Sequence, residues 1–269
     1  MIIDFHTHIF PDKIAERSLE FLASQSKSAP HTKGTATDLE RSMREGGVDI
    51  SISLPVLTKP EQFDSVFKFS LAINEKFVEN NNRGILSFGG IHPADEKYKE
   101  HLKLLKDNGF KGIKIHSDYQ HSFVNEEISK AIIDEASNLD LITVLHAGVD
   151  IGFPEPVHCP PDLSLEVIRE VHPRKLVLAH MGGWKQWDMV EELLVNEDIW
   201  LDTAFSLEYC DRAQLFRIFE KMGYDRILFA TDSPWSDQKT YVEEVRKMPL
   251  SDEIKEMIFG KNAEKLLKL

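Results

Sequence analysis

Short apolar runs and longer amphipathic stretches follow one another along the chain. The apolar runs are rich in Ile, Leu and Val, and several lack polar alternation, which is typical of strands covered on both faces. We interpret them as eight strands at Ile2–His8, Val48–Leu54, Ile85–Ile91, Gly112–His116, Leu141–His146, Leu176–His180, Ile199–Thr203 and Ile227–Thr231.

Between these runs, apolar residues recur with the period of a helix. Helix start and stop signals agree with this interpretation, because Asn125 precedes one stretch and Gly109 and Gly223 follow two others. The predicted helices include Asp64–Glu79, Glu96–Asp107, Glu126–Asn138, Ser164–Val171, Met189–Val195 and Glu208–Met222, with two more in the tail at Ser251–Phe259 and Asn262–Leu267.

The order of these elements predicts the fold class. Eight strand–helix units in 269 residues favour an α/β protein with a (β/α)8 TIM barrel, a single domain over residues 1–269 with extra C-terminal helices. The alternative is a doubly wound open sheet. That fold usually carries a Gly-rich phosphate loop, and the glycine pairs of this chain lack the spacing of such a loop.

The amino-acid composition argues against some kinds of binding partner. The formal net charge of −13 argues against a nucleic acid or an anionic membrane surface as partner, and no apolar run approaches the length of a membrane span. The first residues enter a strand-like run, so we expect no signal peptide. The two cysteines, Cys159 and Cys210, form no disulfide framework and fit a reducing cytoplasm. We therefore expect a cytoplasmic protein.

Histidines gather where the predicted strands end. Six of the eleven histidines lie at or just after the end of an apolar run, and Asp232 follows the last run. Barrel enzymes place their active sites at this end of the strands. The six residues are His6, His8, His92, His116, His146 and His180.

The first pair, His6 and His8, has the spacing of a metal-ligand pair. Successive side chains of a strand alternate between faces, so residues two apart share a face and their imidazoles converge on one point. Divalent transition metals bind such imidazole pairs. A single His-X-His triplet is weak evidence, and it gains weight from the histidines and Asp232 downstream.

Four segments in this order resemble the amidohydrolase superfamily. They are Asp4–His8, Leu145–Gly148, Ala179–Gly183 and Phe229–Trp235. The similarity is to the amidohydrolase-related (amidohydrolase 2) branch, which holds aminocarboxymuconate-semialdehyde decarboxylase and its relatives, and it extends over nearly the whole chain.

The resemblance implies a metal-dependent barrel. It implies that His6, His8, His146 and Asp232 ligate one divalent metal ion, with zinc the expected identity, and that His180 acts on the bound water or the substrate. Physical chemistry fits these roles, because a divalent cation lowers the pKa of its water toward about 7 and a histidine transfers protons near neutral pH. Asp232 would also accept a proton from the water.

We predict a hydrolase that cleaves a small amide, ester or lactone with metal-activated water. The alternative is a non-oxidative metal-dependent decarboxylase (a carboxy-lyase) of an aromatic or enal carboxylate, which needs the same metal ligands. No arginine lies at a strand end to hold a substrate carboxylate, which favours the hydrolase. A minor alternative is a non-catalytic relative that binds a metal or small molecule.

Four further residues are candidate contacts for the small-molecule substrate. His116 and Lys114 share a strand face, His92 lies in a loop, and Trp235 follows Asp232. Binuclear members of the superfamily carry a carboxylated lysine, but Lys114 lies deeper than His116. The plainer interpretation is that Lys114 pairs with a carboxylate such as Asp202 or Asp232, or that it anchors a substrate carboxylate. We therefore expect one metal rather than two. The sequence does not decide which substrate or which metal the protein binds, or whether it forms a homodimer.

Overall fold

The computed structural model describes residues 1–269, in which strands and helices alternate along the chain. Every strand is short and almost wholly buried, as the apolar runs predicted. The strands are β1 (Ile3–Thr7), β2 (Ile50–Ser53), β3 (Gly84–Ser87), β4 (Gly89–Gly90), β5 (Gly112–Ile115), β6 (Ile142–Leu145), β7 (Leu176–Leu178), β8 (Trp200–Asp202) and β9 (Ile227–Leu228).

These strands pair in chain order and all in parallel. One sheet has the order β1-β2-β3 and the other the order β4-β5-β6-β7-β8-β9, and only Phe88 separates β3 from β4. The predicted strand Ile85–Ile91 therefore corresponds to β3 and β4 together. Phe5 N–H donates to the carbonyl of Phe229, and Asp232 N–H donates to the carbonyl of His6, at 2.8 Å each. These bonds join the last strand to the first and close the predicted eight-membered barrel.

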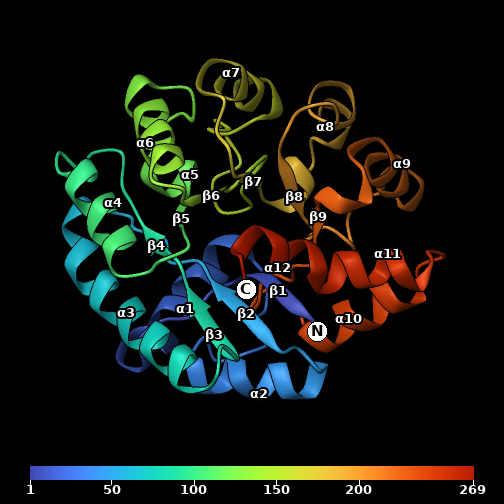
Figure 1. The fold of residues 1–269 in the computed structure, drawn as a ribbon, viewed down its shortest axis with the longest axis horizontal. Helices are drawn as coiled ribbons and strands as arrows, with labels where there is room; N and C mark the ends of the chain where they lie inside the picture. The colour runs from blue at the N-terminus through green and yellow to red at the C-terminus, as the bar shows by residue number, and fades with distance from the viewer.

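Helices surround this barrel as an outer ring (Figure 1). The predicted helical stretches are all present, with ends that shift by a few residues. The helices are α1 (Asp12–Ser26), α2 (Ala36–Gly46), α3 (Phe63–Glu79), α4 (Tyr98–Asp107), α5 (Ser117–Gln120), α6 (Glu127–Asn138), α7 (Pro161–Val171), α8 (Trp187–Leu193), α9 (Arg212–Met222), α10 (Gln238–Lys247), α11 (Asp252–Glu256) and α12 (Asn262–Leu267). Short 3-10 or π turns lie at η1 (Pro60–Gln62), η2 (His180–Gly182), η3 (Tyr224–Arg226) and η4 (Met257–Lys261).

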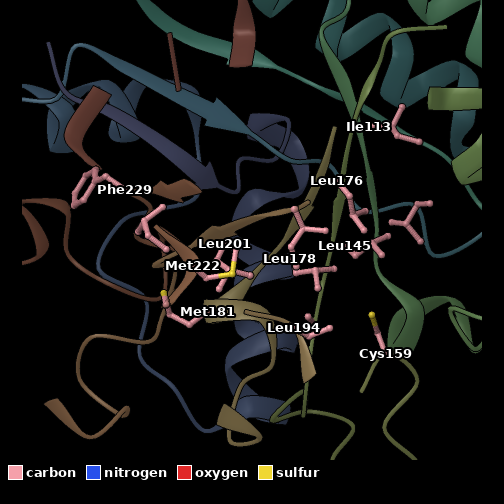
Figure 2. Close-up of a cluster of buried hydrophobic side chains, with 14 of the residues drawn as sticks. Ile113, Leu145, Cys159, Leu176, Leu178, Met181, Leu194, Leu201, Met222 and Phe229 are labelled. Carbon is pink, nitrogen blue, oxygen red and sulfur yellow. The ribbon is translucent and has the colours of Figure 1, made fainter. Parts of the chain in front are cut away.

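The apolar core has two parts. The larger cluster lies between the strands and the surrounding helices, and Figure 2 shows the portion of it that includes Leu178, Leu201 and Met222. The smaller cluster combines residues of β1, β2, β3, β6, β7, β8 and β9 with Ala263, Leu266 and Leu267 of α12. Helix α12 therefore covers the end of the barrel at which the strands begin, and in Figure 1 it crosses the middle of the ring. The strand-end histidines lie at the opposite end, where the strands finish.

Helices α1, α2, α5 and α10 were not among the predicted stretches. Helix α1 buries only Ala15 and Leu19 and exposes Ile14 and Phe21, so its apolar period is weak. Helices α2 and α10 do have local signals. The side chain of Thr35 accepts the Asp38 N–H at the start of α2, and that of Asp237 accepts the Thr240 N–H at the start of α10. No helix is both long and apolar enough to cross a membrane.

Candidate metal centre

Three predicted ligands from the two ends of the chain meet at the carboxyl ends of the strands. The Nε2 atoms of His6 and His8 lie 3.2 Å apart. Asp232 Oδ1 lies 3.5 Å from His6 Nε2 and 3.2 Å from His8 Nε2. Two atoms that both bind one ion at metal-ligand distance lie roughly 3 to 3.5 Å apart. The three atoms therefore have the spacing of ligands around one divalent cation.

The other nitrogens of these two imidazoles indicate which tautomer each histidine adopts. His8 Nδ1 lies 2.8 Å from the carbonyl oxygen of Leu54, so it must carry the proton. His6 Nδ1 lies 2.9 Å from Asp202 Oδ2, and burial lowers the pKa of His6 well below its usual value, so its ring is neutral. His6 Nε2 then presents a lone pair to Asp232, and so does His8 Nε2 in the neutral form of its ring. In that form three acceptors face one another, and a divalent metal between them fits this arrangement.

A β-bulge orients His6. Asp4 pairs with Ser51 and Thr7 pairs with Ser53, so three steps along β1 oppose two steps along β2. Phe5, next to His6, belongs to the smaller apolar cluster, and the regular alternation of a strand would turn His6 away from it. The bulge breaks that alternation and directs the imidazole toward Asp202 at the end of β8.

Lys114 of β5 extends to the same group of atoms. Its Nζ lies 3.3 Å from His6 Nε2, and only 1% of the residue is exposed. Burial lowers the pKa of Lys114 to about 8. The ion pair predicted for Lys114 is absent. No carboxylate oxygen of Asp202 or Asp232 lies within ion-pair distance of Nζ, because the lysine side chain ends beside an imidazole instead.

His180 lies beside this group in a strained backbone conformation. Its φ is 57°, that of Asp232 is 68°, and non-glycine residues rarely adopt such positive values. Strain of this kind persists where surrounding contacts hold it, and it is concentrated at functional sites. His180 Nδ1 lies 3.0 Å from the carbonyl oxygen of Ala204, and its backbone N–H donates to Asp202 Oδ1 at 2.9 Å.

His146, the predicted fourth ligand, does not belong to the group formed by His6, His8 and Asp232. Its Nδ1 is 3.0 Å from His180 Nε2, and its ring stacks on that of His116 with centroids 4.0 Å apart. It belongs to a second group of ligand-type side chains, with His116 and Asp150. The His180 imidazole contacts its Nδ1, and the role of His146 as the fourth ligand stays a prediction.

The other two predicted contacts lie in loops of the same end. His92 is buried, and its Nδ1 accepts the N–H of Ala94 at 3.0 Å, which stabilises the turn after β4. Trp235 is half-buried, and its N–H donates to the carbonyl of Asp232 at 2.8 Å. Neither belongs to a group of ligand-type side chains, and their contact with substrate stays a prediction.

Three carboxylates of this region were not predicted as site residues. Asp202 binds both His6 and the backbone of His180, while Asp118 and Asp150 lie near His146. Asp202 is the penultimate residue of the predicted strand Ile199–Thr203, which was a usable signal. Asp118 and Asp150 lie two and four residues beyond strand-end histidines, where only the loop conformation decides whether they turn toward the site.

Three solved structures with the same fold are decarboxylases, and two of them contain manganese. The chain is 16% identical to 5-carboxyvanillate decarboxylase from Novosphingobium aromaticivorans, complexed with manganese and 4-hydroxy-3-methoxy-5-nitrobenzoic acid (100% of this chain and 96% of that chain covered, TM-score 0.75). It is 17% identical to dihydroxybenzoic acid decarboxylase from Polaromonas sp. JS666 with bound manganese and 2-nitroresorcinol (100% and 97% covered, TM-score 0.72). It is 15% identical to 2,6-dihydroxybenzoate decarboxylase from Rhizobium (99% and 98% covered, TM-score 0.70). At these identities the likeness shows the fold, and it confirms the predicted TIM barrel.

A search of curated proteins finds no match to this sequence. The sequence model of one family, described as amidohydrolase, matches residues 3–269. This match spans the strand-end histidines and Asp232 together with the closing helix α12, which agrees with the resemblance of the four segments. The chain therefore belongs to the amidohydrolase family.

Proposed function

We propose that the protein is a metal-dependent hydrolase of a small amide, ester or lactone. The observation that carries the proposal is the group of three ligand-type atoms, His6 Nε2, His8 Nε2 and Asp232 Oδ1, separated by 3.2 to 3.5 Å. A divalent ion held there supplies Lewis-acid activation of a water molecule and of the substrate carbonyl. Because imidazole ligands are neutral, Asp232 is the only one of the three ligands that carries a negative charge, and the ion therefore stays a strong Lewis acid.

His180 is the proposed proton carrier. The carbonyl of Ala204 accepts the proton of Nδ1 at 3.0 Å. Nε2, which faces His146 Nδ1 at 3.0 Å, is therefore the atom that would accept a proton from water and return it to the leaving group. Asp232, whose Oδ1 lies 3.5 Å from His6 Nε2, is the second candidate acceptor. Lys114 Nζ lies 3.3 Å from His6 Nε2, and the His116 ring stacks on that of His146. We retain both residues, with His92 and Trp235, as proposed substrate contacts.

One divalent ion is proposed for this centre, with zinc as the predicted identity. Manganese is present in two of the structures with the same fold, so both ions belong in the test. We retain His146 as the proposed fourth ligand. A titration with zinc or manganese should show that His8→Ala abolishes binding, and a metal affinity for His146→Ala equal to that of the wild type would contradict the fourth-ligand role.

Decarboxylation of an aromatic or enal carboxylate is the second candidate. The structures with the same fold that are named above are decarboxylases, and Lys114 Nζ is a cation at which a substrate carboxylate could bind. Four carboxylates of this chain border the same region, however, at Asp118, Asp150, Asp202 and Asp232, and none of the arginine ion pairs involves them. These carboxylates offset the positive charge of Lys114 and of a bound ion, and no arginine lies at a strand end to hold a substrate carboxylate, which favours the hydrolase.

Product analysis distinguishes the two reactions. The metal-loaded protein would be incubated with a panel of lactones, esters, amides and aromatic acids, while acid release and CO2 release are recorded separately. We expect acid release without CO2, and a loss of at least about 100-fold in kcat for His180→Asn with unchanged metal content. His172→Asn is the control, because His172 is exposed at the end of α7. CO2 release from an aromatic acid, with no hydrolysis, would establish the second candidate instead.

A further inference from the structure

A small cavity lies at the end of the barrel where the strands begin, opposite to the metal centre. Its volume is about 140 Å³, and its charged lining residues are Lys106, Lys111, Lys175, Lys268 and Asp140. Lys111 and Lys175 come directly before β5 and β7, and Lys268 follows α12, the helix that covers this end. Buried apolar side chains of the barrel and of α12 complete the lining. Charged residues from separate segments of the chain therefore meet at one hollow.

The charge of this cavity is opposite in sign to that of the chain. Four lysines against one aspartate leave an excess of three positive charges, whereas the whole chain has a formal net charge of −13. Charges of one sign that line a concave site focus their field and concentrate counter-ions there. The cavity therefore attracts a small anion, while the acidic chain as a whole repels an extended polyanion such as a nucleic acid.

Asp140 compensates only two of the four lysines. Its Oδ1 lies 2.6 Å from Lys175 Nζ, and its Oδ2 lies 2.7 Å from Lys268 Nζ. Hydrogen bonds from these two lysines lower the pKa of Asp140 to about 2, so its carboxylate is ionised at neutral pH. Both carboxylate oxygens are occupied by these pairs, and Lys106 and Lys111 have no carboxylate within ion-pair distance.

The helix ends at this side of the barrel do not occupy the ammonium groups either. Helices α4, α6 and α12 end here, and lysines often bind the last carbonyls of a helix. In each of these helices the backbone N–H of the C-cap residue already binds carbonyls of the last turn. None of the four ammonium groups donates to a carbonyl oxygen, and Lys268 donates to Asp140 instead. The lysines of the cavity are therefore available to a ligand.

A phosphate group has the chemistry that this lining would bind. It carries up to two negative charges and three or more acceptor oxygens, so it can bridge several ammonium groups at once. A single carboxylate supplies one charge and would leave more of the excess positive charge uncompensated. Only 17% of the Lys175 side chain is exposed, and burial lowers the pKa of this lysine. An anion beside it would stabilise its charged form.

We propose that the cavity between Lys106, Lys111, Lys175 and Lys268 binds a phosphate group, either free or at the end of a small ester. The apolar part of the lining would contact the carbon atoms of such an ester. The inference goes beyond the proposed function and does not depend on it, because the metal centre lies at the other end of the barrel.

Methyl phosphate and methyl sulfate form a matched pair of probes. They have the same shape, but at pH 8 the phosphate ester carries close to two negative charges and the sulfate ester one. Calorimetric titration in sodium chloride of about 0.15 M should give a Kd at least about fivefold lower for methyl phosphate. Equal affinities for the two esters, or no saturable binding of methyl phosphate or inorganic phosphate below about 10 mM, would overturn the proposal.

Inorganic phosphate, as the third probe, distinguishes the two sources of the phosphate group. Binding as tight as that of methyl phosphate would assign the cavity to the free ion. Weaker binding than that of methyl phosphate would assign it to a small ester. Both results support a phosphate site, provided that methyl sulfate binds more weakly than either.

Variants of the two unpaired lysines assign the binding to this cavity. Lys106→Gln and Lys111→Gln should each weaken methyl phosphate binding about two- to fivefold, and the double variant about tenfold. Neither lysine has an ion pair, so these variants should fold like the wild type. Lys239→Gln, at an exposed position on α10 without an ion pair, is the control and should bind like the wild type. Wild-type affinity in the double variant would contradict the assignment.

The variant His8→Ala separates this cavity from the metal centre, where a phosphate could also bind. Methyl phosphate would be titrated into the metal-loaded wild type and into His8→Ala, and the binding sensitive to Lys111→Gln should persist in His8→Ala. Loss of all phosphate binding in His8→Ala would place the ligand at the metal centre and overturn the inference. Wild-type protein that binds phosphate but no divalent metal would refute the proposed function and leave the cavity assignment intact.

Discussion

Asp202 shows how one buried side chain organises two functional residues. Its Oδ2 accepts from His6 Nδ1, and its Oδ1 accepts the backbone N–H groups of His180 and Ala204 at 2.9 and 3.0 Å. The first contact directs the lone pair of His6 toward the metal centre. The second holds His180 in its strained conformation. A carboxylate behind a metal-binding histidine raises the basicity of that ligand and fixes its orientation.

We expect Asp202→Asn to weaken metal binding by about 10- to 100-fold. The amide has one acceptor oxygen in place of two, so either His6 Nδ1 or the two backbone N–H groups must face an NH2 group. Titration calorimetry with zinc or manganese measures the loss, and Asp162→Asn is the exposed control. Wild-type affinity in Asp202→Asn would show that His6 needs no carboxylate behind it.

At the scale of elements, charged pairs on the outer ring join helices whose apolar faces already pack. Glu191 of α8 binds Arg217 and Lys221 of α9, which lie one helical turn apart, at 2.9 and 2.8 Å. The hydrogen bonds from Arg217 and Lys221 lower the pKa of Glu191 from 4.5 to about 2. The ionised carboxylate therefore stabilises the folded state above the pKa of the unfolded chain.

This shift predicts a pH-dependent effect of Glu191→Gln. The folded pKa is depressed, so the stabilisation is fully present above about pH 4.5 and is lost as the pH falls toward 2. The difference in unfolding free energy between the wild type and Glu191→Gln should be larger at pH 6 than at pH 3, as measured by urea unfolding. Glu192→Gln, on the same helix with no ion pair, is the control. A difference that is independent of pH would argue against the pairing.

At the scale of the whole molecule, the metal centre joins the beginning of the chain to its end. His6 and His8 come from β1, whereas Asp232 follows β9, and backbone hydrogen bonds between these segments close the barrel. In the unfolded chain these three residues are far apart, so the metal binds only the folded state. It therefore adds its binding free energy to the stability of the closed barrel.

Metal loading should accordingly stabilise the fold. At a free metal concentration of 100 times the Kd, the unfolding free energy should rise by about 2.7 kcal/mol, because the ion binds only the folded state. Thermal unfolding with and without a chelator measures the change. In His8→Ala the chelator should have no effect, whereas the exposed variant His172→Asn should behave like the wild type. A melting temperature that is insensitive to metal would contradict the proposed centre.

The sequence by itself determined the barrel, the family and the end of the barrel at which the candidate metal ligands lie. Apolar runs report strands covered on both faces, and parallel order brings their carboxyl ends to one place, so His6, His8 and Asp232 were recognisable without coordinates. The predicted strands all occur in the structure. Helix α1, whose apolar period is weak, was not recognised, and α2, α5 and α10 were also missed.

Only the tertiary structure decided how the side chains are oriented within that end. The bulge in β1 turns His6 toward Asp202, and loop hydrogen bonds direct Asp118 and Asp150 toward His146. Each depends on contacts between residues far apart in the chain, which no local pattern encodes. The position of His146 beside His180 has the same origin. Strand periodicity therefore predicts which residues reach the site, whereas bulges and loops, which break that periodicity, decide what each residue contacts there.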